Sequence, residues 1–160
     1  MSARRIVYAL FLVGVLVSAQ TPSSYAQSRP FTVNARFPVQ IEVFIPCANG
    51  GAGESVILTG ILHDVFHVTE FADGTFFLKI HDQPQNIKGV GETTGAVYKA
   101  TGVTQTRISS IGPTTTFINN FRIIGAGPGN NLLIQDHMHV TVNGKGEITA
   151  EFSRARADCR

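Results

Sequence analysis

Apolar and polar side chains alternate with a period of two along most of the chain beyond residue 30. The clearest run extends from Val39 to Ile45, between Pro38 and Pro46. Period two is the spacing of a strand whose two faces meet different surroundings, whereas a helix needs a period near 3.6. Short segments rich in Gly, Asn, Asp and Pro separate the alternating runs, as is typical of turns. The pattern predicts an all-β domain with almost no helix.

Two dipeptides predict hairpins within this pattern. Asp73-Gly74 and Asn143-Gly144 each lie between extended runs, and both are typical of short hairpin turns. We expect a single domain at residues 30–160 with about eight antiparallel strands. The expected strands are 39–45, 55–71, 75–81, 90–100, 103–111, 115–124, 132–142 and 147–153.

Two stretches predict interruptions of the strands. Residues 82–89 contain Pro84 and are expected to form a loop, because proline cannot donate a strand hydrogen bond. Gly91, Gly95 and Gly102 interrupt the next part of the chain. Glycine inside a strand pattern indicates a bulge or a bend, so we expect two shorter strands there.

The two cysteines, Cys47 and Cys159, bear on how the strands are arranged. They follow the first and the last expected strands, and a lone pair in an exported chain favours a disulfide bond. A disulfide requires Cα atoms within about 7 Å, so it would bring the first and last strands together. Short connections make neighbouring strands pair antiparallel. We therefore expect an up-and-down β-barrel, with a two-sheet β-sandwich as the alternative.

The N-terminal segment predicts export by the general secretory route. Two arginines precede an uncharged apolar run at residues 6–17, which is shorter than the roughly 20 residues of a membrane span. Ser24-Tyr25-Ala26 then places small residues at the −3 and −1 positions of a cleavage site. We expect a signal peptide at residues 1–26 with cleavage after Ala26; cleavage after Ala19 is the alternative. The mature protein is then secreted or periplasmic, without membrane attachment.

The charge balance argues against a nucleic acid or an anionic lipid as partner. The whole chain has 13 Lys and Arg against 11 Asp and Glu, a formal charge of +2. Arg4 and Arg5 belong to the expected signal peptide, while every acidic residue lies beyond it, so the mature domain is neutral. A neutral domain has no net attraction for a phosphate backbone or an anionic lipid. We expect no nucleic-acid partner.

Histidine is the residue type whose spacing indicates a metal site. His137 and His139 fall on one face of a strand, and His63 and His67 are spaced to do the same. Imidazole suits zinc, copper or nickel, so these four residues are candidate ligands for a divalent transition metal. However, Met138 and its apolar neighbours take the opposite face, which would be the core side of an antiparallel sheet. Solvated surface histidine is the interpretation we favour, and no other cofactor is indicated.

The same alternation directs two carboxylates inward. Asp136 shares its face with Met138, and Asp64 shares its face with Phe66. An unpaired carboxylate in apolar surroundings is costly, and a raised pKa is the usual outcome. Asp64 and Asp136 are therefore candidates for a general acid and base, or for holding the polar end of a ligand. A bulge beside either residue would reverse its direction, and we favour that simpler interpretation.

No catalytic motif is assembled in the sequence. The run Gly125–Gly129 lacks the following helix that a nucleotide-binding loop requires. An eight-stranded barrel is just wide enough to be filled by side chains or to hold one small ligand. We therefore expect a non-catalytic module that binds a small apolar ligand or a protein partner. The alternatives are a small barrel enzyme of isomerase or cyclase type that uses Asp64 and Asp136, and a histidine-based metal-binding protein.

Overall fold

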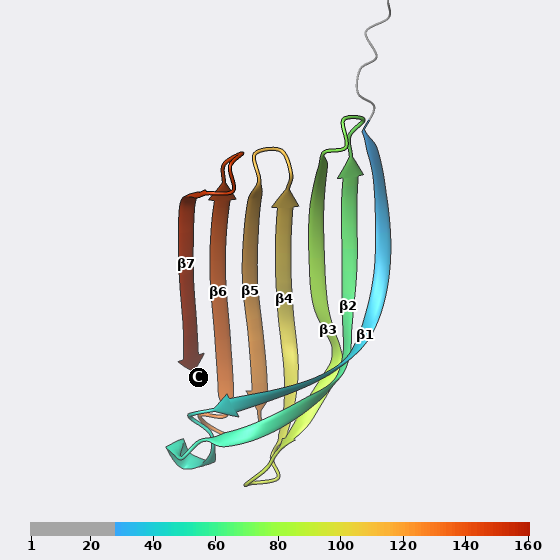
Figure 1. The fold of residues 1–160 in the computed structure, drawn as a ribbon. Coiled ribbons are helices and arrows are strands. Elements are labelled where there is room, and N and C mark those ends of the chain that lie inside the picture. Colours follow the sequence, from blue (N-terminus) through green and yellow to red (C-terminus); the bar gives the residue numbers. More distant parts are fainter. Residues whose placement is uncertain (1–27) are drawn as a thin grey trace, which may run out of the picture.

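The computed structural model describes residues 28–160, which form one antiparallel sheet in the order β1-β2-β3-β4-β5-β6-β7 (Figure 1). The strands are β1 (Arg29–Ile45), β2 (Glu54–Glu70), β3 (Phe76–Gly91), β4 (Val97–Ser109), β5 (Thr114–Gly125), β6 (Asn131–Val142) and β7 (Ile148–Cys159), and a 3-10 turn η1 (Asn49–Gly51) follows β1. The all-β prediction is confirmed. The predicted signal peptide and its cleavage site lie outside the described residues. Within residues 28–160, no helix is long and apolar enough to cross a membrane.

The sheet has seven strands rather than the expected eight, because residues 97–109 form one continuous strand. Gly102 lies in the middle of this strand with φ +141°, and a Cβ atom there would lie 2.1 Å from the backbone oxygen of Asn120 on β5. Glycine is the residue that permits both this backbone angle and this close approach. Gly102, where a bulge or bend was expected, thus lies within a continuous strand and permits the close approach of β5.

Residues 82–89 belong to β3 and do not form the expected loop. The pairing of β3 with β4 is interrupted between Asp82 and Lys88. Pro84 lies in this gap, so it has no partner on β4 although it pairs with Leu62 on β2. Asn86 adopts a positive φ of 55°, as one residue of a β-bulge can. The strand therefore continues through the proline by means of a bulge.

The seven strands form one sheet that is not closed into a barrel, and they do not divide into the two separate sheets of a sandwich. The predicted disulfide between Cys47 and Cys159 is confirmed, with a Cα–Cα distance of 5.9 Å. The expected barrel does not follow from this bond, because the lower parts of β1 and β2 sweep across the front of the sheet towards the end of β7 (Figure 1). The disulfide thus fastens a folded-over flap, and β1 and β7 remain the two edges of the sheet.

The hydrophobic core lies at the lower end, between the folded-over part of β1 and β2 and the remaining strands. Its buried members are Ile45, Ala48, Val56, Leu58, Ile87, Tyr98, Ala100, Ile123 and Leu132. Each fully buried aliphatic side chain contributes roughly 1.5–3 kcal/mol to folding. We call the face of the sheet that carries this core the inner face, and the opposite face the outer face. The upper end of the inner face extends beyond the core.

Candidate functional site

A row of polar side chains crosses the middle of the inner face. The strand register places Asp64 opposite Asp82, Asp82 opposite Thr104, Thr104 opposite Asn119, and Asn119 opposite Asp136. Directly opposite residues project from the same face of a sheet. The continuous register of β1 with β2 puts this row on the same face as the buried Val56 and Leu58. We call these five residues the polar row.

One half of the polar row is connected by hydrogen bonds. The Thr104 Oγ1 hydroxyl donates to Asn119 Oδ1 over 3.0 Å, and Asn119 Nδ2 donates to Asp136 Oδ2 over 3.0 Å. Each side chain is partly buried in the sheet. The carboxylate of Asp136 therefore has a protein donor, and this half of the row has internal polar partners.

The other half of the row is a pair of carboxyl groups, Asp64 and Asp82. Asp64 is 9% exposed, and its Oδ1 atom is buried without a hydrogen-bond partner among the described residues. Burial raises the pKa of Asp64. Burial, followed by the charge of the neighbouring Asp64, raises the pKa of Asp82 to about 6. Two carboxyl groups placed side by side resist double ionisation, so the pair retains a proton to an unusually high pH.

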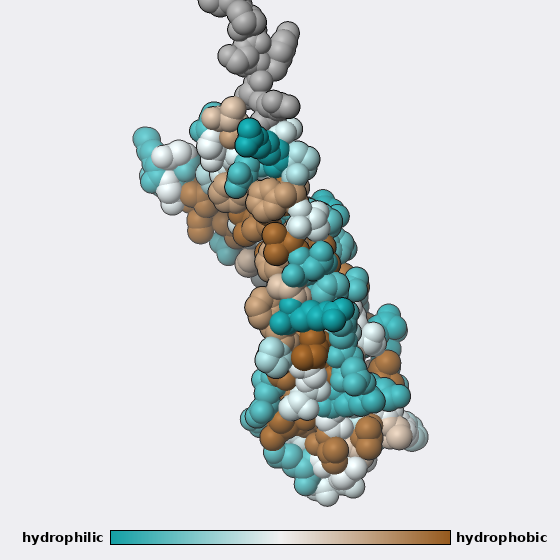
Figure 2. Space-filling model, turned by 90° about the vertical axis from the view of Figure 1, so that its right-hand side faces the viewer, coloured by the Kyte–Doolittle hydropathy of each residue, from teal (hydrophilic) through white to brown (hydrophobic). Residues whose placement is uncertain are grey.

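Ten apolar side chains lie in the two rows above the polar row, towards the start of β1, and these rows also include Thr106, Thr115, Ser153 and Glu151. We call these ten residues the upper inner face: Phe31, Val33, Phe66, Val68, Leu78, Ile80, Ile108, Phe117, Met138 and Val140. Phe31 is 45% exposed and Val33 is 47% exposed. Figure 2, seen from the β1 side, shows brown apolar side chains gathered in the upper half, while the right-hand flank there is mostly hydrophilic. Contiguous exposed apolar surface is a common feature of interaction sites, so the upper inner face is a candidate for one.

The structure places both candidate catalytic residues, Asp64 and Asp136, on the inner face, and no bulge reverses either of them. It does not bring them together. They lie on β2 and β6, which are separated by roughly 19 Å along the sheet at 4.8 Å per strand step. The carboxyl group that Asp64 does meet is that of Asp82. The sequence pattern does not reveal this partner, because Pro84 predicts a loop at residues 82–89 and Asp82 then lies outside any strand.

The four candidate metal ligands form two separate pairs on the outer face. His63 and His67 lie on β2, and His137 and His139 lie on β6, with three strands between them. Two of the rings contact threonine hydroxyls on neighbouring strands. His67 Nδ1 lies 3.1 Å from Thr32 Oγ1, and His139 Nδ1 lies 2.8 Å from Thr116 Oγ1. Within residues 28–160, no group of three or more His, Cys, Asp or Glu side chains is placed to hold a metal ion.

A buried carboxylate that the sequence analysis missed lies in the core. Glu54 is 2% exposed. It accepts a 2.7 Å hydrogen bond from the Tyr98 hydroxyl and further bonds from the backbone N and Oγ1 of Thr94. These hydrogen bonds, of which the one from Tyr98 has the largest effect, hold the pKa of Glu54 below its usual value. Burial, followed by the hydrogen bond to Glu54, raises the pKa of Tyr98 to about 12. Glu54 occupies an alternate position of the same strand as Val56 and Leu58, so the sequence pattern could have placed it on the core side. We assign this pair to stability.

Charge is divided between the two faces of the sheet. The strand residues on the outer face include the basic side chains Arg36, Lys79, Lys88, Lys99, Arg107, Arg122, Arg154 and Arg156, with Glu42 and Asp158 as acidic residues. The inner face carries Glu54, Glu70, Glu151 and the three aspartates of the polar row, with Arg29 as a basic residue. Residues 28–160 have a formal net charge of zero, and this balance conceals a basic outer face and an acidic inner face. A net-charge argument cannot detect this separation, because it ignores the direction of side chains.

A search of protein-family models, of curated proteins and of solved structures finds no match to this chain. Function is therefore inferred from the surfaces themselves. The upper inner face offers apolar contact area, and it adjoins the Asp64–Asp82 carboxyl pair of the polar row. This combination is suited to holding an organic molecule in one orientation, since apolar area supplies affinity and a few polar groups fix direction.

Proposed function

We propose that this protein is an exported, non-catalytic binding module that holds a small, largely apolar molecule on the upper inner face. The observation that carries the proposal is the Asp64–Asp82 carboxyl pair beside exposed apolar side chains, because Asp64 Oδ1 has no hydrogen-bond partner outside this pair among the described residues. An unsatisfied buried acceptor costs about 1–3 kcal/mol. A ligand that donates a hydrogen bond to the carboxyl pair recovers part of such a cost when it binds.

The surroundings of the Asp64–Asp82 pair define the chemistry of the ligand. The pair accepts hydrogen bonds and carries negative charge once its protons are lost, so it favours a hydroxyl or an amine. The two apolar rows above it favour a hydrocarbon or aromatic body, since buried apolar area contributes about 25 cal/mol per Å². The ligand class is therefore an apolar molecule with a hydroxyl or amine at one end.

Export is supported by two features. The N-terminal pattern predicts a signal peptide, and the Cys47–Cys159 disulfide is compatible with an oxidising compartment outside the cytoplasm. In such a compartment an open apolar surface serves to capture a small molecule from the surrounding solution.

Nile red fluorescence tests the apolar part of the proposed site, because this dye is neutral, apolar and brightens in apolar surroundings. We expect saturable binding to the wild-type protein and its loss in the double variant Phe31→Ser/Val33→Ser. The matched control is Ile57→Ser/Val90→Ser, which removes residues of comparable exposure, 38% and 53%, from the outer face. Equal loss in both variants, or no binding to the wild type, contradicts the proposal. A stable dimer that hides the upper inner face in solution also contradicts it.

A second candidate function rests on the pKa of Asp82, which is raised to about 6. A carboxyl group with a pKa near the working pH is suited to general acid–base catalysis. In this case Asp64 and Asp82, rather than Asp64 and Asp136, would exchange protons with a substrate. Mass spectrometry of a ligand that copurifies with the protein separates the two functions. An unchanged ligand mass and structure after long incubation supports binding, whereas conversion that is lost in Asp82→Asn supports catalysis.

A further inference from the structure

The outer face has a polar hollow that the proposed function does not use. It lies between β5, β6 and β7 and has a volume of about 400 Å³. Its outward side chains come from two adjacent cross-strand rows: Ile118, His137 and Arg154 in one, and Asn120, Gln135 and Arg156 in the other. The hollow therefore brings two guanidinium groups, two amides and an imidazole to one place.

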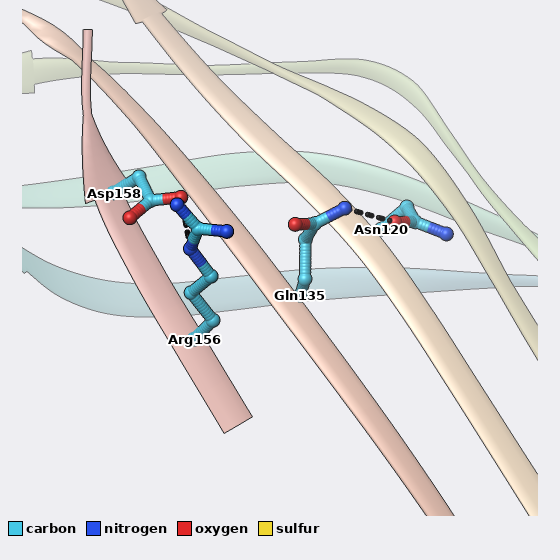
Figure 3. Close-up of polar contacts among 4 residues, drawn as sticks. All are labelled: Asn120, Gln135, Arg156 and Asp158. Carbon is cyan, nitrogen blue, oxygen red and sulfur yellow. Dashed lines mark hydrogen bonds and ion pairs between the residues drawn. The ribbon is translucent and has the colours of Figure 1, made fainter. Parts of the chain in front are cut away.

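The side chains of the hollow are partly fixed by their neighbours (Figure 3). Gln135 Nε2 donates a 3.0 Å hydrogen bond to Asn120 Oδ1, and Arg156 Nε forms a 2.6 Å ion pair with Asp158 Oδ2. The Arg156 side chain is nevertheless 55% exposed. The His137 ring packs edge-on against Phe152, with a centroid distance of 5.2 Å. Asp158 thus orients Arg156 while most of that arginine still faces solvent.

We infer that this hollow binds a carboxylate group of an acidic sugar chain that lies along the outer face. The planar guanidinium groups of Arg154 and Arg156 match the geometry of a carboxylate. The amides of Asn120 and Gln135 provide donors and acceptors for sugar hydroxyls, and the exposed Phe152, at 49%, offers an apolar surface for a sugar ring. The basic side chains that continue across the outer face attract the rest of an anionic chain.

A sugar chain fits this face better than a nucleic acid does. Proteins that bind single-stranded nucleic acid stack successive bases on aromatic side chains, whereas the hollow has amides, arginines and one flanking phenylalanine. A duplex requires an element that enters a groove, and the outer face is the surface of a sheet. The predicted export also places the protein among extracellular polymers.

Isothermal titration calorimetry with purified oligogalacturonate tests the inference. We expect binding to the wild-type protein that weakens at least roughly tenfold in Arg154→Gln/Arg156→Gln, because each charge-assisted hydrogen bond contributes about 1.5–3 kcal/mol. The matched control, Arg36→Gln/Arg107→Gln, removes the same charge from the same face outside the hollow and should weaken binding by less than about threefold. The fully methyl-esterified oligomer lacks the carboxylates and should not bind.

Several outcomes would overturn the inference. These are an equal loss of affinity in both variants, equal binding of the methyl ester, or tighter binding of single-stranded DNA of the same charge. An NMR titration of the wild-type protein keeps the test independent of the folding of the variants. The amide shifts should be largest in residues 118–120, 135–137 and 154–156, and uniform shifts across the outer face count against a defined site.

Discussion

Asp64 and Asp82 lie directly opposite each other on β2 and β3, and both project from the apolar inner face. Asp64 is almost fully buried, and the pKa of Asp82 is raised to about 6 by burial and by the charge of Asp64. Natural sheets avoid like charges in direct opposition because the pair destabilises the fold. The pair therefore costs stability at this position, and this cost is the physical basis for our proposal that it binds a ligand.

The first prediction concerns the pH dependence of this cost. Below about pH 4 the Asp82 carboxyl is protonated in both folded and unfolded states. As pH rises, the unfolded state loses its proton first, so the free energy of unfolding should fall until the pH passes the folded pKa of about 6. Asp82→Asn should remove this fall and stabilise the protein at pH 7 by about 1 kcal/mol, a modest value because the group is partly exposed.

Urea denaturation from pH 4 to pH 7 measures this effect. Glu151→Gln is the control, because it removes a carboxylate from an exposed position on the inner face of β7. If Asp82→Asn and Glu151→Gln change the pH dependence equally, the pair is not the source of the effect.

The second prediction concerns the buried pair of Glu54 and Tyr98. Tyr98→Phe leaves the Glu54 carboxylate without the 2.7 Å hydrogen bond from the phenol, so we expect the Tm to fall by roughly 5–10 °C at neutral pH. The wild-type protein should also lose stability as pH rises from about 10 to 12, because the folded pKa of Tyr98 is about 12. Thermal melts followed by circular dichroism check both effects. Thr101→Val, an exposed change on β4, is the control, and a Tyr98→Phe variant as stable as this one contradicts the prediction.

Part of this architecture follows from the sequence because its physical causes are local. The alternation in Thr115–Ile124 and the turns at Asp73-Gly74 and Asn143-Gly144 predict strands and hairpins, and the structure has them as β5 and as the connections that follow β2 and β6. The disulfide also follows, because the chain has two cysteines and both lie just after predicted strands.

The remaining features depend on contacts between strands, which the sequence does not display. Gly102 and Pro84 interrupt the local pattern, yet both lie inside strands because the neighbouring backbone accommodates them. The candidate site also depends on contacts between strands. Asp64 and Asp136 were identified by parity within their own strands, whereas the pairing of Asp64 with Asp82 depends on the register between β2 and β3.

The third prediction concerns the Cys47–Cys159 bond, which joins residues 112 positions apart. Closing a loop of this length stabilises a fold by about 5 kcal/mol in the chain-entropy model. We expect Cys47→Ser/Cys159→Ser to lose most of this free energy of unfolding in urea titrations. Hydrogen exchange should accelerate most in the folded-over parts of β1 and β2, which the bond fastens to the end of β7. The wild-type protein with reductant should show the same free energy of unfolding and the same exchange rates as the variant. Faster exchange confined to the upper ends of the strands contradicts the model of a fastened flap.

The fourth prediction concerns Gly102, which lies in β4 with φ +141°. In Gly102→Ala the new methyl group would meet the backbone oxygen of Asn120 at 2.1 Å, and an alanine also strains this backbone conformation. We expect a loss of about 2–4 kcal/mol in the free energy of unfolding, measured by urea denaturation. Gly144→Ala is the matched control, because no atom lies within 4 Å of its added Cβ and its φ is not in the positive range. A small, equal effect of both substitutions would show that β4 and β5 do not approach each other this closely at Gly102.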